Sequence, residues 1–210
     1  MEARRLALLE QELVEQAREG DAEAFEALAR MTARRLFPIA HRIVRDSDAA
    51  EDAIQQTLVT IWKELPRLRE TQRYQAWSYR ILTRASFEEI KRRKRRQQLA
   101  EITPDHMTAQ DGTESVETRD EIERAFGQLS PEHRAVVVLR FYADLPIKEI
   151  GYALGIPSGT VGSRLHRAIA DMRRLIEQSE PPAPTGTSGA TDRTDTTDSE
   201  GTSYAGESVR

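Results

Sequence analysis

Cysteine is absent from the 210-residue sequence, so the chain can form no disulfide and use no thiol in catalysis or metal binding. Aromatic residues make up only 6% of it, and no apolar run is long enough to cross a bilayer. The N-terminal segment has acidic residues throughout and lacks the apolar centre of a signal peptide. We therefore expect a cytoplasmic protein that does not contact a membrane directly.

Catalytic and metal-binding patterns are also missing. The sequence contains no HExxH, GxGxxG or P-loop pattern. The four histidines are scattered along the chain, at His41, His106, His133 and His166. We expect no enzyme activity, no cofactor and no metal site.

The charge of the chain is distributed unevenly. Although the net charge is −4, residues 80–96 hold eight basic and two acidic side chains. Residues 134–176 hold seven basic and three acidic side chains, and the segments between and after these two are acidic. Two separate basic segments indicate a protein that contacts a polyanion at two places.

Sustained strand-like alternation is absent, and almost every periodic segment has helical spacing, which predicts an all-α protein. A first helix is expected over residues 3–18, and Asp21 should cap a second helix that Pro38 kinks or interrupts. Asp48 and Glu51 resemble a capping box for a third helix, which Pro66 ends. A fourth helix is predicted over residues 76–96.

The pattern divides the chain into two small helical domains. Residues 97–118 are acidic and lack apolar periodicity, which predicts a flexible linker between a domain over 1–96 and another over 119–178. Within the second domain, Ser130 and Pro131 form a strong helix start. Residues 179–210 are rich in Pro, Thr, Ser, Gly and Asp, which predicts an acidic, disordered tail.

Residues 145–169, LPIKEIGYALGIPSGTVGSRLHRAI, have the pattern of a helix-turn-helix. Ile147, Ile150 and Leu154 should face inward on a first helix that Gly155 closes, and Ser158 should cap the second. The outer face of the second helix is polar and cationic, which suits a DNA major groove. The alternative is an ordinary helical hairpin with a solvated face.

The first basic segment follows several aromatic residues, and aromatic rings beside cations suit the binding of unpaired bases. Tyr74, expected in the loop before the fourth helix, is the better candidate for base contact, whereas Trp77 could equally be a core anchor. The run KRRKRR alone would also fit a solvated helix end or an anionic membrane patch.

These motifs together resemble the bacterial RNA polymerase sigma factors of the extracytoplasmic-function group. The segments DAAEDAIQQTLVTIWKEL, YQAWSYRILTRA and LSPEHRAVVVLRFYADLPIKEIGYALGIPSGTVGSRLHRA follow the family's order over roughly residues 21–176. The resemblance implies a region 2 helical bundle that binds core polymerase and recognises and melts the −10 element. It also implies a region 4 helix-turn-helix that reads the −35 element, and control by an anti-sigma factor.

The resemblance also implies site residues. Those for core polymerase are Asp52, Gln55, Gln56 and Trp62; those for −10 recognition and melting are Tyr74, Trp77, Arg80, Arg84, Lys91 and Arg92; those for the −35 element are Ser158, Thr160, Ser163, Arg164 and Arg167.

Two positions depart from the family pattern. Arg84 stands where Asn is frequent, and it does not offer the donor and acceptor pair of an amide to a flipped base. Gly162 stands where Lys or Arg is frequent, which removes a possible phosphate contact. A free-standing helix-turn-helix regulator is the alternative function, although it would need neither a polymerase-binding helix nor an aromatic melting segment.

Overall fold

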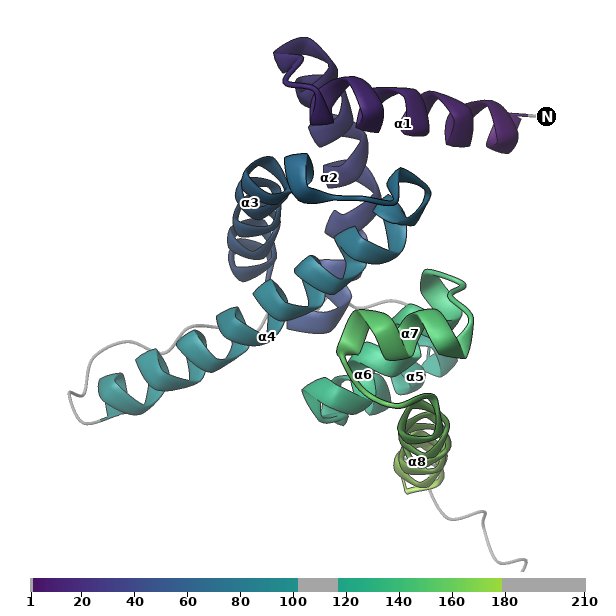
Figure 1. The fold of residues 1–210 in the computed structure, drawn as a ribbon. Coiled ribbons are helices and arrows are strands. Elements are labelled where there is room, and N and C mark those ends of the chain that lie inside the picture. The colour runs from purple at the N-terminus through teal and green to yellow at the C-terminus, as the bar shows by residue number, and fades with distance from the viewer. Residues whose placement is uncertain (1, 102–116, 179–210) are drawn as a thin grey trace, which may run out of the picture. The chain divides into compact units, whose positions relative to one another are not determined.

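The structure is a computed structural model that describes residues 2–101 and 117–178 (Figure 1). Every regular element within these ranges is helical, so the all-α prediction is confirmed. The elements are α1 (Glu2–Arg18), α2 (Ala22–Val44), α3 (Ser47–Glu64), η1 (Leu65–Arg67), η2 (Thr71–Arg73), α4 (Tyr74–Glu101), α5 (Glu117–Gln128), α6 (Pro131–Val137), the π-helical turn η3 (Val138–Tyr142), α7 (Ile147–Leu154) and α8 (Ser158–Glu177).

The predicted linker and tail fall largely outside the described residues. The linker was expected from residue 97, but α4 continues to Glu101 and α5 begins at Glu117, two residues before the expected start of the second domain. The remainder of the linker and the tail prediction for 179–210 lie outside the described ranges. No helix in the described part of the chain is both long and apolar enough to span a membrane.

Side-chain caps start three of the helices, because the first backbone N–H groups of a helix have no partner within it. Asp21 accepts hydrogen bonds from the amides of Glu23 and Ala24, as predicted. Ser130 caps α6, with Pro131 in the first turn, also as predicted. The cap of α3 is Asp46, which accepts from the Ala49 amide at 2.8 Å, so the predicted start at Asp48 is wrong by two residues.

Proline has different effects in α2 and after α3. Pro38 lies inside α2 without ending it, so the predicted interruption is wrong. The residues around it, Leu36, Ile39 and Ile43, are buried, and their packing offsets the missing backbone donor. Pro66 lies in the turn η1 directly after α3, where the sequence predicted the helix to end.

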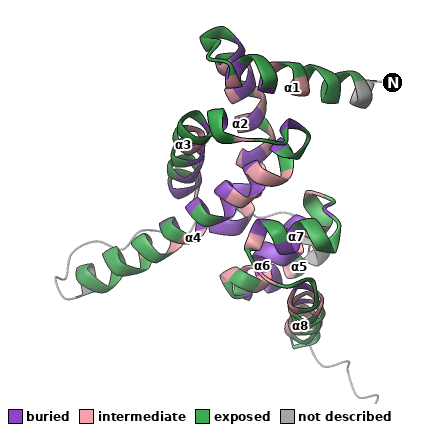
Figure 2. Ribbon diagram, viewed as in Figure 1, coloured by how far each residue is buried: buried purple, intermediate pink, exposed green. Residues whose placement is uncertain are grey.

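The first four helices surround a core in which α2 and α3 pack against α4. One cluster joins α1 to this bundle through Val14, Leu28, Ile61 and Leu65, all of which are at most 1% exposed. Figure 2 shows buried residues along α2, α3 and the first half of α4, whereas the C-terminal end of α4 is exposed. The bundle therefore fixes the first half of α4 and leaves its basic end open to solvent.

In the helix-turn-helix, α7 ends at Leu154 and Gly155 adopts a left-handed φ of +68°, as the sequence predicted. Two details differ from the prediction. Ile147 is 40% exposed rather than inward, because it begins α7 at the edge of the core. Ser158 is the first residue of α8 rather than its cap; Pro157 takes the cap position and offers no side-chain hydrogen bond.

Candidate nucleic-acid interface

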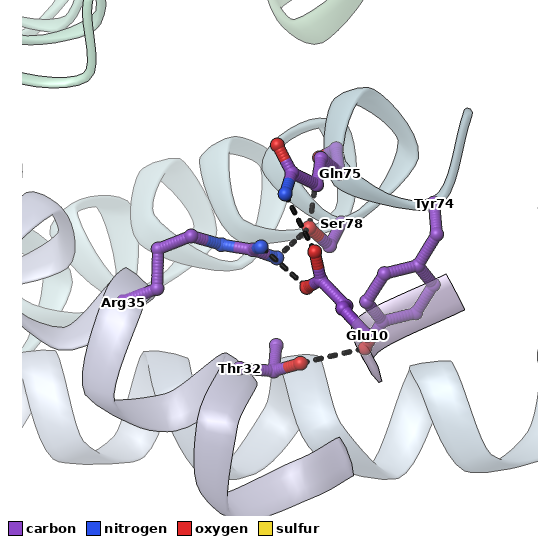
Figure 3. A network of polar contacts seen from close by, with 6 residues as sticks. All are labelled: Glu10, Thr32, Arg35, Tyr74, Gln75 and Ser78. Atoms are coloured by element: carbon purple, nitrogen blue, oxygen red, sulfur yellow. Dashed lines mark hydrogen bonds and ion pairs between the residues drawn. The ribbon is translucent and has the colours of Figure 1, made fainter. Parts of the chain in front are cut away.

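A polar network holds the start of α4 against α1 and α2 (Figure 3). The carboxylate of Glu10, a residue only 6% exposed, pairs with Arg35 Nη1 at 2.5 Å and accepts from Gln75 Nε2 at 2.5 Å. Arg35 Nη2 also donates to Ser78 Oγ at 3.2 Å. Gln75 and Ser78 belong to the first turns of α4. This network fixes the register of the segment that carries Trp77 and Arg80.

Tyr74 is part of the interior and not of the preceding loop, so that prediction is wrong. It begins α4, the residue is 2% exposed, and its hydroxyl oxygen lies 2.7 Å from that of Thr32. Desolvation by burial raises the pKa of Tyr74 to about 12. The ring is consequently closed off from a nucleic-acid base in this structure.

The other residues predicted for the −10 element differ in their exposure. Trp77 is half-buried, with its ring tilted against that of Tyr74 at a centroid distance of 6.0 Å. The Arg80 guanidinium lies 4.9 Å from the centre of the Tyr152 ring. Arg84 is exposed, one turn further along α4. Trp77 and Arg84 therefore present side chains to solvent, whereas Arg80 is half-buried against the Tyr152 ring.

The cations of the first basic segment have two kinds of surroundings. Glu89 is 3% exposed and accepts from Arg92 Nη1 at 2.8 Å and from Arg96 Nη2 at 2.6 Å. Arg93 pairs with Asp46, the cap of α3. The hydrogen bond from the Ala49 amide, reinforced by Arg93, holds the pKa of Asp46 below its ordinary value despite partial burial. Three arginines of this segment are thus paired with carboxylates of the fold.

Lys91, Lys94 and Arg95 lie on the exposed part of α4. Lys91 pairs with the exposed Glu88 at 3.0 Å. Within the described residues, neither Lys94 nor Arg95 forms a hydrogen bond or an ion pair. Of the two residues predicted for the −10 element within the run KRRKRR, Lys91 is thus at the surface, and Arg92 pairs with a buried carboxylate.

The predicted polymerase-binding residues share one exposed face of α3. Asp52, Gln55 and Gln56 are exposed, and Trp62 is 50% exposed with its ring edge-on to Phe25 at 4.5 Å. Spacings of three and four residues place them on one side of the helix. Val59, 46% exposed, lies in the middle of this face. The sequence analysis missed Val59, although its spacing from Gln55 and Gln56 could have identified it.

The outer face of α8 brings together four of the five residues predicted for the −35 element. Val161 and Ala168 are buried, and Ser163 and Arg167 are exposed on the opposite side of the helix, whereas Thr160 and Arg164 are half-buried at the edge of that exposed side. Ser158 is separate from them: a Cβ placed on Gly151 of α7 would lie 3.6 Å from its hydroxyl oxygen. Ser158 thus borders the supporting helix, and the other four form the candidate groove-facing surface.

Two family descriptions match the parts of the chain that carry these surfaces. Sigma-70 region 2 matches residues 28–96, and sigma-70 region 4 matches residues 125–174. The chain is 31% identical over 159 residues to the ECF RNA polymerase sigma factor SigM of Mycobacterium tuberculosis, which covers 75% of this chain and 79% of SigM. It is 30% identical over 161 residues to the RNA polymerase sigma-E factor of Streptomyces avermitilis, covering 77% and 89% of the two chains.

Solved structures share the fold at lower identity. CnrH in its complex with the cytosolic domain of CnrY has a TM-score of 0.60 and 23% identity, covering 82% of this chain and 99% of that one. RpoE of Bartonella quintana, in complex with the anti-sigma factor NepR, has a TM-score of 0.60 and 20% identity. The match covers 76% of this chain and 100% of the RpoE chain.

The helical bundle, the helix-turn-helix and both sigma-70 regions define a transcription initiation factor that binds DNA, a class whose members are not enzymes. Within that class, the chain belongs to the extracytoplasmic-function RNA polymerase sigma factors. As a sigma factor it binds core RNA polymerase and promoter DNA.

Proposed function

We propose that the three exposed surfaces divide the work of promoter-specific initiation. The outer face of α3 binds core polymerase, the exposed side of α4 recognises and opens the −10 element, and the outer face of α8 reads the −35 element. The observation that carries this proposal is the presence, in one chain, of both sigma-70 regions with these faces open to solvent. Base unpairing is then driven by binding energy, without a catalytic group.

The composition of the α3 face supports a protein partner. Its exposed residues are an acid, two amides and two apolar side chains: Asp52, Gln55, Gln56, Val59 and Trp62. Lys and Arg supply most of the affinity of proteins for DNA phosphates, and this set contains neither. A half-exposed tryptophan next to an exposed valine is typical of the anchor residues of protein interfaces.

On α4, Trp77 and Arg84 are the best placed to meet an unpaired strand. An aromatic ring can stack on a base, and a guanidinium can stack or hold a phosphate. Because Arg84 cannot reproduce the paired donor and acceptor of an amide, the preferred −10 sequence should differ from that of relatives with Asn at this position.

On α8, Arg164 and Arg167 supply the cations, and Thr160 and Ser163 the hydroxyl groups, for a helix in the major groove. Ser163 Oγ donates to the carbonyl of Thr160 at 3.0 Å and keeps its lone pairs available as acceptors. Gly162 adds no cation to this face, so backbone phosphates are held by the two arginines.

We also propose that an anti-sigma factor controls the chain. Support comes from the structural relatives, one in complex with the anti-sigma factor NepR and one with the cytosolic domain of CnrY. A protein that covered the α3 face would block polymerase binding. The cytoplasm, where RNA polymerase and promoters meet, is the proposed compartment.

Transcription in vitro tests this function directly. The full chain is mixed with bacterial core polymerase and fragmented genomic DNA, and transcript starts are mapped against core polymerase alone. New starts that share upstream −35 and −10 sequences are expected. Specific duplex binding without core polymerase, and without new starts, would instead favour the free-standing regulator.

A further inference from the structure

The first half of α1 carries apolar side chains that remain largely open to solvent. Leu6, Leu8 and Leu9 are 51%, 61% and 44% exposed. Figure 2 shows exposed residues along this half of the helix, whereas Val14 and Ala17, further along, are buried against the bundle. Sigma-70 region 2 matches from residue 28 onward, so these leucines lie outside the part of the chain that carries the family's pattern.

Opposite charges stand on either side of the exposed leucines. A shallow depression in this surface is lined by Arg5, Leu6, Leu8, Leu9 and Glu12. Steps of three and four residues join Arg5 to Leu8 and Leu9, and join both leucines to Glu12. These four side chains, Arg5, Leu8, Leu9 and Glu12, form the α1 patch. Among the side chains that the structure describes, neither Arg5 nor Glu12 has a hydrogen bond or an ion pair.

The α1 patch is complementary to a reversed copy of itself. Its centre lies between Leu8 and Leu9, and Arg5 and Glu12 are equally far from that centre along the helix. When a second α1 helix runs antiparallel across this centre, Arg5 of each copy lies beside Glu12 of the other, and the leucines meet at the two-fold axis. A parallel arrangement would instead bring like charges together.

We propose that the α1 patch is the interface of a symmetric homodimer, in which two copies of this chain pair their α1 helices in antiparallel orientation. A second copy is the occupant that the charges favour, because the patch contains both the acid and the base that an isologous contact needs. An anionic membrane would attract Arg5 but repel Glu12. The inference goes beyond the proposed function and does not depend on it.

The size of the patch predicts a weak and reversible dimer. Stable interfaces bury about 800 Å² on each partner, and four residues of one helix cover much less. The leucines supply the apolar burial, whereas the exposed ion pairs add little affinity and mainly select the antiparallel orientation. We expect a dissociation constant of about 10 to 500 µM.

Sedimentation equilibrium of the full chain tests whether the dimer forms. Concentrations from about 5 µM to about 1 mM bracket the expected dissociation constant. The apparent mass should rise with concentration from 23.8 kDa towards twice that value. A chain that stays monomeric over the whole range would overturn the proposal.

Charge reversal tests the antiparallel pairing. R5E leaves two acids in the patch and E12R leaves two bases, so each variant alone should dimerise at least about tenfold more weakly than the unmodified chain. An equimolar mixture of R5E and E12R should recover the dimer, because each acidic patch then meets a basic one. Both substituted residues are exposed, so the fold should be unchanged. A mixture that associates no more strongly than either variant alone would refute the pairing.

R34E is the matched control, since it changes the net charge as R5E does but lies at an exposed position of α2. It should dimerise like the unmodified chain. Equal weakening by R34E and R5E would assign the effect to net charge and overturn the proposal, as would undiminished dimerisation of R5E and E12R.

L8Q tests the apolar centre of the patch and should also weaken the dimer at least about tenfold. Phosphatidylglycerol vesicles provide the competing partner. A monomeric chain that binds these vesicles, and loses them in L8Q, would assign the leucines to a membrane and overturn the homodimer.

Discussion

The hydroxyl oxygens of Thr32 and Tyr74 lie 2.7 Å apart in the interior of the first domain, and they tie α2 to the first residue of α4. Both side chains are almost fully buried. The pair fixes the start of the helix that carries the −10 surface without contributing to that surface.

The first prediction is that Tyr74→Phe destabilises the chain by about 1 to 3 kcal/mol, because the buried Thr32 hydroxyl loses its partner. Urea unfolding measures the change. Thr32→Val should cost a similar amount, and the double variant should cost less than the sum of the two. Additive costs would show that the two hydroxyls do not stabilise each other.

The raised pKa of Tyr74 predicts a dependence of stability on alkaline pH. Its pKa is about 12 in the folded chain against 10.0 for an ordinary tyrosine, so the unfolded chain loses the phenolic proton first. The contribution is complete below about pH 10, and about 2 to 3 kcal/mol are lost as the pH rises through 12. Tyr74→Phe is the control, since its stability should fall less over this interval.

Glu88 and Glu89 are neighbours on α4, and each forms ion pairs with basic residues of the same helix. Their glutamine variants compare the stability contributed by an exposed and a buried carboxylate. Glu89→Gln should destabilise the chain by about 1 to 3 kcal/mol, because Arg92 and Arg96 lose their buried counterion. Glu88→Gln changes an exposed ion pair that water and salt screen, and it should have little effect on stability. Thermal or urea unfolding of both variants checks the difference, and equal effects would contradict the structural role of Glu89.

Two glycines of the helix-turn-helix should respond oppositely to alanine. A Cβ on Gly151 would lie 2.8 Å from the backbone oxygen of Ile156, so Gly151→Ala should destabilise the second domain by about 1 to 3 kcal/mol. A Cβ on Gly162 meets no atom within 4 Å, so Gly162→Ala should stabilise α8 by about 1 kcal/mol. Unfolding midpoints measure both, and a loss of stability in Gly162→Ala would indicate a close neighbour there.

Arg164→Ala and Arg167→Ala should each weaken binding to the −35 element by about 1 to 3 kcal/mol. Arg173→Ala is the control, because Arg173 is exposed on the same helix but outside the face that these residues share. Footprints of the polymerase complex on a promoter found by transcription in vitro measure the effect. A footprint unchanged by both substitutions would refute the proposed docking of α8.

Val59→Lys should weaken the affinity for core polymerase at least tenfold, about 1.4 kcal/mol, because it places a charge in the middle of the α3 face. Glu64→Gln changes the net charge by the same amount near the end of α3 and should have little effect. Co-sedimentation or fluorescence binding with core polymerase compares the two. Equal affinities would exclude Val59 from the interface.

The sequence predicted most of the main helices in the described part of the chain, because their apolar spacing, prolines and caps are local signals. Gly155 and Ser130 behave as their residue types predict. Helix ends were less certain: Asp46 and Asp48 are both suitable caps two residues apart, and only packing selects between them.

The candidate surfaces were predicted less completely than the fold. Tyr74 was expected to contact a base, but its partner Thr32 is 42 residues away in sequence, and no local pattern indicates that contact. The sequence also contained no sign that Arg93, in the run KRRKRR, pairs with Asp46, which caps a different helix. Exposure, as for Val59, also depends on neighbours that periodicity does not identify.

The continuity of α4 from Tyr74 to Glu101 has a consequence for how this chain can vary. One residue added or removed between Arg84 and Lys91 would turn everything beyond it by about 100° around the axis. Lys91, Lys94 and Arg95 would then no longer lie on the side of the helix that Arg84 faces, and Arg93 would lose its ion pair with Asp46. Substitutions in this interval change one contact at a time, whereas an insertion or deletion changes the angular phase of the whole helix end. We therefore expect functional variants of this chain to keep the residue count of this interval even where its residues differ.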